Sequence, residues 1–201
     1  MILPNQLTVL RIILTPVFVY LFLMDDPVLK QISLGVFILA AITDWYDGWL
    51  ARKFNYITAW GKFLDPLADK ILTSAAFFAF VFLDVLSLWM VIVIVSRDFL
   101  VTFLRMYADM RKHSFATSRL AKWKTFIQMF FLYYLLAAYI LQTVPWIYNG
   151  NEYIFNVLTN TILIYWTMFG ITLITVYSGF QYIYRNKNLI LTLVSLENKS
   201  N

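Results

Sequence analysis

The sequence contains no cysteine and a single histidine, His113. The absence of cysteine excludes disulfide bonds, thiolate metal sites and a cysteine nucleophile. With one histidine, the remaining metal ligands are carboxylates and water, which favour a hard ion such as Mg²⁺ or Mn²⁺. A di-iron carboxylate bundle is excluded as well, because it needs Glu-x-x-His pairs and this chain has none.

Charged residues are also scarce. They make up 13% of the 201 residues, whereas 61% are hydrophobic, and an ordinary soluble domain is more polar than this. The composition predicts an all-α, polytopic membrane protein with a single domain covering residues 1–201. The net charge of +5 suits either nucleic acid or lipid head groups. In a membrane protein, basic residues mainly indicate which side of the membrane a loop occupies and where lipid head groups bind. We therefore expect membrane lipids and no nucleic acid as partners.

Six apolar stretches predict six transmembrane helices. They cover residues 7–24, 32–50, 63–83, 88–104, 123–142 and 157–178. A short apolar piece at residues 189–194 is expected to lie in the membrane interface. Arg11, near the start of the first stretch, is expected to reach the nearer surface with its long side chain. Arg97 and Asp98 interrupt the fourth stretch and are expected to face protein, because charge in lipid is costly.

Basic residues are distributed unevenly over the predicted loops. Lys30 falls on one side of the membrane, whereas the basic groups within residues 52–62, 105–124 and 185–199 fall on the other. By the positive-inside rule the more basic side is cytoplasmic. Both termini and the acidic motif between residues 44 and 70 are then expected to face the cytoplasm.

That acidic motif is where the chemistry is expected. Asp44 and Asp47 are three residues apart and Asp65 and Asp69 are four apart, so each pair projects from one face of a helix. Two such helices would form one acidic cage, and Gly48 would let a ligand approach the backbone closely. Two divalent cations would match the four negative charges and clamp the oxygens of a displacement at phosphorus. The pattern predicts an acidic di-metal site at the cytoplasmic end of the bundle.

Two simpler interpretations compete with a metal site. The aspartates could cap helices or pair with the nearby basic residues Arg52, Lys53, Lys62 and Lys70. Each aspartate near the bilayer centre costs roughly 2.5–3.5 kcal/mol, and less at the interface, so four together need a strong compensating partner. A cation carrier with intramembrane aspartates is a remote alternative, because its site is expected near the midplane rather than at helix ends.

The aspartates belong to a pattern of eight fixed positions, Asp44-x2-Asp47-Gly48-x2-Ala51-Arg52-x8-Gly61-x3-Asp65-x3-Asp69. This pattern resembles the signature of the CDP-alcohol phosphatidyltransferase family at every position, which makes the match highly specific. The flanking segments TDWYDGWLARK and GKFLDPLADK and the opening PNQLTVLRI resemble the bacterial phosphatidylglycerophosphate synthase branch in particular.

The resemblance implies a six-helix enzyme of the bacterial cytoplasmic (inner) membrane, usually a homodimer, that joins an alcohol to the phosphatidyl group of CDP-diacylglycerol and releases CMP. It implies two Mg²⁺ ions per site, with Mn²⁺ as an alternative, held by Asp44, Asp47, Asp65 and Asp69. Asp69 would also be the base that deprotonates the attacking hydroxyl. The implied CDP-diacylglycerol contacts are Asn5, Thr8, Gly48, Arg52 and Thr58.

Basic residues within or next to the fourth and fifth stretches are candidates for binding the acceptor alcohol. Arg97 and Arg105 share a helical stripe, as do Arg119 and Lys122. Two converging cationic faces would bind the phosphate of glycerol 3-phosphate, and we single out Arg105 and Lys122 for this role. Lys122 and Lys124 are two residues apart and diverge on a helix. The further candidates are Arg97, Arg119 and Lys124.

Alternatives to this acceptor pocket remain open. Arg97 could pair with an internal carboxylate such as Asp98 of a neighbour, while the other cations form a solvated or lipid-facing patch. The expected reaction gives phosphatidylglycerophosphate and CMP. Within the same family, another acceptor would make the protein a cardiolipin, phosphatidylinositol phosphate or phosphatidylserine synthase.

Overall fold

Helices make up all the regular structure in the part of the chain that the structure describes. This structure, a computed structural model, describes the backbone of residues 3–54, 59–111, 115 and 118–197, and the side chains of residues 6–43, 46, 64–111, 115 and 118–187. The helices are α1 (Leu3–Leu23), α2 (Pro27–Phe54), α3 (Ala59–Phe82), α4 (Leu88–Met110), α5 (Arg119–Leu141), α6 (Pro145–Tyr148), α7 (Glu152–Leu158) and α8 (Thr161–Glu197). The all-α prediction is confirmed for these residues.

The six long helices follow the order of the six predicted stretches, and α8 differs most from its prediction. It is a single helix from Thr161 to Glu197, so the apolar piece at residues 189–194 is part of it and not a separate element. The helix continues because residues 161–197 contain no proline and only isolated glycines. The short helices α6 and α7 lie in the predicted turn between the fifth and sixth stretches.

Three described stretches are long and apolar enough to cross a membrane, namely Gln6–Leu23, Arg119–Leu141 and Glu152–Lys187. Pro27–Thr43 is a shorter apolar helix. The helices α2, α3 and α4 carry the charged residues that the sequence placed near helix ends or facing protein. The apolar helices agree with a membrane protein, and the count of six spans stays a prediction.

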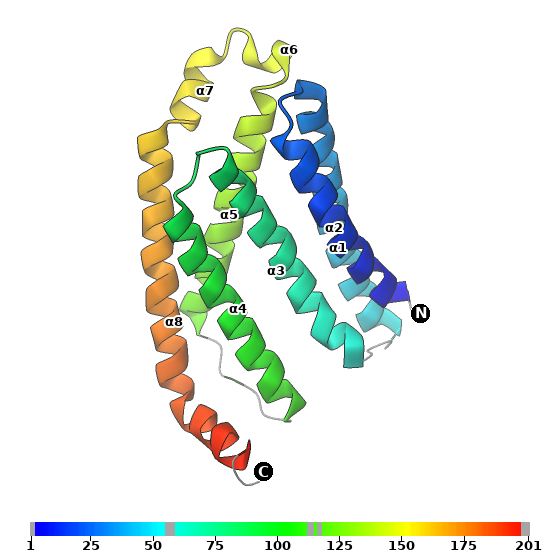
Figure 1. The fold of residues 1–201 in the computed structure, drawn as a ribbon, viewed down its shortest axis with the longest axis vertical. Coiled ribbons are helices and arrows are strands. Elements are labelled where there is room, and N and C mark those ends of the chain that lie inside the picture. The colour runs from blue at the N-terminus through cyan, green and yellow to red at the C-terminus, as the bar shows by residue number, and fades with distance from the viewer. Residues whose placement is uncertain (1–2, 55–58, 112–114, 116–117, 198–201) are drawn as a thin grey trace.

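Successive long helices run in opposite directions (Figure 1). The beginnings of α1, α3 and α5 and the ends of α2, α4 and α8 therefore lie toward the same end of the molecule. We call this the site end, because most of the predicted functional residues lie at or near these helix termini. The helices α6 and α7 lie at the opposite end.

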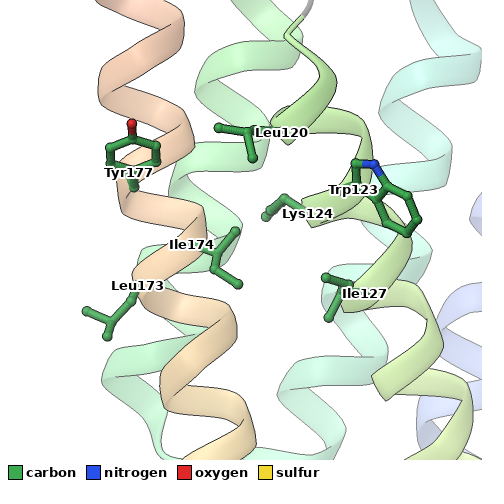
Figure 2. Close-up of a pocket in the computed structure, with 7 residues that line it drawn as sticks. All are labelled: Leu120, Trp123, Lys124, Ile127, Leu173, Ile174 and Tyr177. Atoms are coloured by element: carbon green, nitrogen blue, oxygen red, sulfur yellow. The ribbon is translucent and has the colours of Figure 1, made fainter.

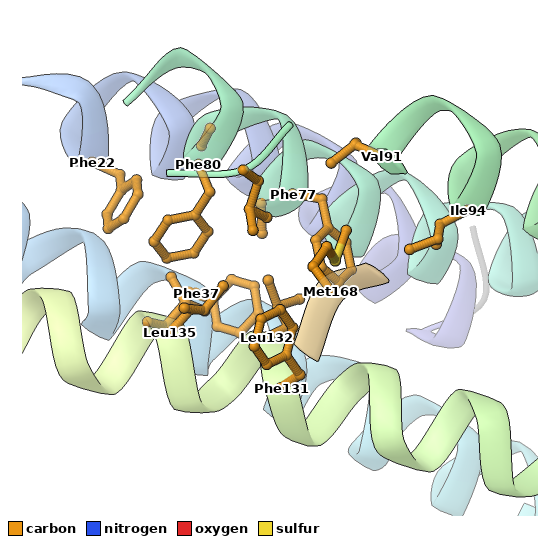
Figure 3. Packing of buried hydrophobic residues seen from close by; sticks show 14 of the residues in the cluster. Phe22, Phe37, Phe77, Phe80, Val91, Ile94, Phe131, Leu132, Leu135 and Met168 are labelled. Atoms are coloured by element: carbon orange, nitrogen blue, oxygen red, sulfur yellow. The ribbon is translucent and has the colours of Figure 1, made fainter. Parts of the chain in front are cut away.

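Aromatic rings fill much of the buried core (Figure 3). The ring centroids of Phe18 and Phe37 are 5.1 Å apart, and Phe22 meets Phe80 edge to face at 5.2 Å. Ala40 is fully buried, which lets α1 and α2 approach closely. The outer faces carry many exposed large hydrophobic side chains, and a surface of this kind suits contact with lipid.

Arg11 does not reach the surface, and the expectation that it would is wrong. Its side chain is fully buried, and its Nε donates a hydrogen bond to the Ala40 carbonyl at 3.3 Å. The side chain lies on the face of α1 that packs against α2, so the neighbouring helix, rather than water, surrounds it. Long basic side chains reach the interface only from faces that neighbouring helices leave open.

Candidate active site

Three helix termini at the site end carry the predicted nucleotide contacts of the N-terminus and the predicted acidic motif. Asn5 and Thr8 lie in the first turns of α1, Asp44 and Asp47 lie in the second half of α2, and α3 carries the second aspartate pair. The predictions for the side chains of Asn5, Asp44, Asp47, Gly48 and Arg52, and for Thr58, fall outside the residues that the structure describes. Their roles therefore stay predictions.

Thr8 and Asp65 are brought into direct contact although 57 residues separate them in sequence. The Thr8 hydroxyl, which is fully buried, donates a hydrogen bond to Asp65 Oδ1. This bond joins the first turns of α1 to the first turns of α3. A hydrogen bond from a second residue fixes the direction in which a carboxylate presents its oxygens to a ligand. The contact joins a predicted nucleotide-binding residue to a predicted metal ligand.

Asp69 lies one helical turn after Asp65 on α3, as the spacing predicted. Its side chain is 37% exposed, and its Oδ2 lies 3.4 Å from the Nζ of the neighbouring Lys70. Both side chains are partly exposed, and an ion pair that water can reach contributes little to stability, so the carboxylate remains available to a ligand. Pro66 lies between the two aspartates, and because it has no N–H it leaves the carbonyl four residues earlier without its helical donor.

The donor set on α3 suits a hard divalent cation. Asp65 and Asp69 offer carboxylate oxygens one turn apart, and Asp65 is oriented by a hydroxyl, which is the chemistry that Mg²⁺ and Mn²⁺ prefer. Among the side chains described, no three or more His, Cys, Asp or Glu residues gather into a group able to hold a metal ion. A complete site would need Asp44 and Asp47, so the four-aspartate cage remains a prediction.

The five predicted acceptor-binding cations are divided between two environments. Arg105 on α4 and Arg119 and Lys122 on α5 are exposed near the site end. Lys124 is 1% exposed, and its Nζ forms an ion pair with Asp98. Lys122 and Lys124 thus point apart, as their spacing predicted. In the described structure the five cations do not form one pocket.

Asp98 is the centre of the second environment. It is 6% exposed and accepts hydrogen bonds from Lys124 Nζ, from Arg97 Nη1 at 3.1 Å and from Gln128 Nε2 at 3.1 Å. Arg97 Nη2 also donates to Ser178 Oγ on α8 at 3.2 Å. The prediction that Arg97 and Asp98 face protein is confirmed.

Sequence reasoning missed two members of this cluster, Gln128 and Ser178. Gln128 lies four residues after Lys124 and therefore on the same face of α5, which is a signal that was available. Ser178 lies 81 residues after Arg97, and nothing local in the sequence marks it.

A groove of about 360 Å³ lies between α5 and α8 beside this cluster (Figure 2). Its lining is mostly apolar, and the ammonium group of its one charged residue, Lys124, binds Asp98 inside the bundle. A smaller neighbouring hollow is lined by Arg119, Lys122, Trp123 and Phe126. The lining residues of the groove are Leu120, Trp123, Lys124, Ile127, Leu173, Ile174 and Tyr177.

Comparison with known proteins extends the similarity over nearly the whole chain. The model of the family described as CDP-alcohol phosphatidyltransferase matches residues 1–193. A Rickettsia typhi protein named CDP-diacylglycerol–glycerol-3-phosphate 3-phosphatidyltransferase is 36% identical over 179 residues, which cover 89% of this chain and 95% of the relative.

Two further relatives carry the same name. The Bacillus subtilis protein is 44% identical over 139 residues, covering 63% of this chain and 72% of the relative. The Salmonella typhimurium protein is 39% identical over 138 residues, covering 66% of this chain and 75% of the relative.

Proposed function

Because the chain belongs to the CDP-alcohol phosphatidyltransferase family, we propose that it transfers the phosphatidyl group of CDP-diacylglycerol to glycerol 3-phosphate, giving phosphatidylglycerophosphate and CMP. The names of the relatives support this acceptor. The structural observation that carries the proposal is the Thr8–Asp65 hydrogen bond. It joins α1, which would contact the nucleotide, to the aspartate pair of α3, which would hold the metal.

The family is generally dependent on a divalent metal, and we propose two Mg²⁺ ions here, with Mn²⁺ as the alternative. Asp44, Asp47 and Asp65 would hold one ion, and Asp44, Asp65 and Asp69 would hold the other. Bound divalent cations offset negative charge that develops on a leaving phosphate. The CDP-diacylglycerol contacts that we propose are Asn5, Thr8, Gly48, Arg52 and Thr58.

Asp69 is the proposed general base. The acceptor hydroxyl oxygen attacks the phosphorus that carries the diacylglycerol group, its proton passes to the Asp69 carboxylate, and the bond from that phosphorus to the oxygen of CMP breaks. A positioned base contributes roughly a hundredfold to ten-thousandfold to such a step. The 37% exposure of Asp69 leaves room for a small acceptor, and no covalent enzyme intermediate is needed.

The acceptor's phosphate would be bound by exposed cations at the site end. We propose Arg105 and Lys122 as its principal ligands, with Arg119 nearby, because charge-assisted hydrogen bonds suit a doubly charged phosphate. Arg97 and Lys124 make their hydrogen bonds to Asp98, so a direct role for them requires that network to rearrange.

We propose a multi-pass protein of the bacterial cytoplasmic membrane with the site end toward the cytoplasm. The basic residues at that end support this orientation. A site at the membrane surface suits a reaction between a lipid with two acyl chains and a water-soluble alcohol. A homodimer is the expected assembly, and its mass in detergent would test this.

The decisive experiment is CMP release by the purified protein with CDP-diacylglycerol and a panel of acceptors. Turnover is expected with glycerol 3-phosphate and a divalent cation, and not with phosphatidylglycerol, inositol phosphate or serine. CMP release with one of those acceptors instead would retain the reaction class and replace the acceptor. No CMP release with any alcohol would contradict an enzymatic role.

A further inference from the structure

We propose that Asp98 is a positioning residue for the acceptor side of the reaction. Its buried carboxylate links α4 to α5 and, through Arg97, to α8. This link fixes the positions of Arg105 and Lys122 relative to each other at the site end. This inference rests on the proposed function, because it takes glycerol 3-phosphate as the acceptor.

The first support is that Asp98 has three partners on two helices. Lys124 and Gln128 reach it from α5, and Arg97 reaches it from its own helix, α4. Arg97 extends the network to Ser178 on α8. Both carboxylate oxygens are engaged, Oδ1 by the two cations and Oδ2 by the amide. Asp98 thus links α4 directly to α5 and, through Arg97, to α8.

The second support is the burial of the charges. Asp98 is 6% exposed and Lys124 is 1% exposed, and a buried ion is tolerated only when it is paired and hydrogen-bonded. Without the Asp98 charge, Arg97 and Lys124 would face each other as two cations. Lys124 would then move toward water, and the first turns of α5 would move with it.

The third support is the distance from Asp98 to the proposed acceptor ligands. Arg105 lies two helical turns after Asp98 on α4, at nearly the same angle around the helix, and about 10 Å along its axis. Lys122 lies two residues before Lys124, on the outward face of α5. A displacement of α5 relative to α4 therefore changes the spacing between the two cations that would hold one phosphate. No part of this role requires Asp98 to contact substrate.

The test uses Asp98→Asn, which keeps the shape of the side chain and removes its charge. Asp109→Asn, an exposed position on the same helix, is the matched control. The KM for glycerol 3-phosphate is expected to rise on the order of tenfold, while the KM for CDP-diacylglycerol changes by less than about twofold. A purely structural role would lower the active fraction, and hence kcat, with both KM values unchanged. Unchanged KM values in the folded variant would overturn the proposal.

A double variant, Asp98→Leu with Lys124→Met, covers the case in which the single variant does not fold. Apolar replacement of a buried ion pair is often neutral for stability, so this protein is expected to fold and still show the raised KM for glycerol 3-phosphate. A wild-type KM in the double variant, or failure of both variants to fold, would overturn the proposal. If the wild-type protein itself does not use glycerol 3-phosphate, the proposed function fails instead, which separates the two outcomes.

Discussion

Gly179 of α8 packs directly against Arg97 of α4. A Cβ atom added at position 179 would lie 3.2 Å from Arg97 Cγ. The Arg97 guanidinium is held by Asp98 and Ser178, so the side chain has little freedom to move aside. Gly170 lies on the same helix, and a Cβ there would meet nothing within 4 Å. This pair of glycines provides a matched comparison on one helix.

Gly170→Ala is expected to stabilise the protein, because alanine is favoured over glycine inside a helix by up to about 1 kcal/mol. In Gly179→Ala the close contact with Arg97 is expected to cancel that gain. The Gly179→Ala protein is then less stable than the Gly170→Ala protein by about 1 kcal/mol or more. Thermal unfolding in detergent measures the difference. Equal stabilisation by both substitutions would contradict the close packing of α8 on Arg97.

Thr8→Val should weaken the site while keeping the shape of the side chain. Without its hydroxyl, Asp65 Oδ1 loses a hydrogen-bond donor, and the loss of such an orienting partner typically costs about 10- to 100-fold in metal affinity or activity. Thr8→Ser keeps the donor and serves as the control. A titration of activity with Mg²⁺ checks the prediction, which is wrong if the valine variant keeps the wild-type dependence on Mg²⁺.

Asp65→Asn should abolish turnover in a folded protein, because the neutral amide is a poor ligand for a divalent cation. The expected activity is below roughly a tenth of wild type even in saturating Mg²⁺, and the same result is expected for Asp44→Asn. Asp84→Asn is the control, since Asp84 lies in the exposed turn between α3 and α4. Retained turnover in Asp65→Asn would remove Asp65 from the metal site.

Arg105→Ala and Lys122→Ala should each raise the KM for glycerol 3-phosphate. A lost hydrogen bond to a charged group is worth about 1.5–3 kcal/mol, which corresponds to roughly tenfold or more. The KM for CDP-diacylglycerol should change little. Lys187→Ala, which removes an exposed cation on α8, is the control for a general effect of charge. Normal acceptor binding by both variants would show that the phosphate is bound elsewhere.

Single cysteines test the orientation, because the chain has no native cysteine to interfere. Lys30→Cys and Glu152→Cys should react with an impermeant reagent in intact cells, since both positions are predicted on the external side. His113→Cys should react only after permeabilisation. Labelling of all three positions from one side would contradict the predicted six spans.

The sequence predicted those features that depend on neighbouring residues. Long apolar runs gave the order of the long helices, and the spacing of four placed Asp65 and Asp69 one turn apart on α3. The contact of Thr8 with Asp65 depends on how α1 packs on α3, which no local pattern reports. The burial of Arg11 was missed for the same reason, because the face that it occupies is set by the packing of α2.

The Asp98 cluster was predictable from the sequence only in part. A charge pair inside an apolar run indicated that Asp98 faces protein, and burial confirms it. The sequence offers Lys124 as a candidate acceptor ligand, because a basic residue near a predicted site suits either role. Its ion pair with Asp98 depends on the rotation of α5 about its axis, and this rotation follows from the packing of whole helices.

Both α4 and α5 are predicted spans, and for two such helices the pairing of Asp98 with Lys124 would affect the order in which they enter the membrane. During synthesis α4 is made before α5. Asp98 therefore lacks its partner Lys124, which follows 26 residues later, until α5 has been made. A lone charge within a membrane segment costs roughly 2.5–3.5 kcal/mol on insertion scales. Arg97 offsets part of that cost from within α4, and Lys124 has no such neighbour in the apolar part of α5. Insertion of α4 and α5 together, as a helical hairpin, is therefore favoured over insertion one helix at a time.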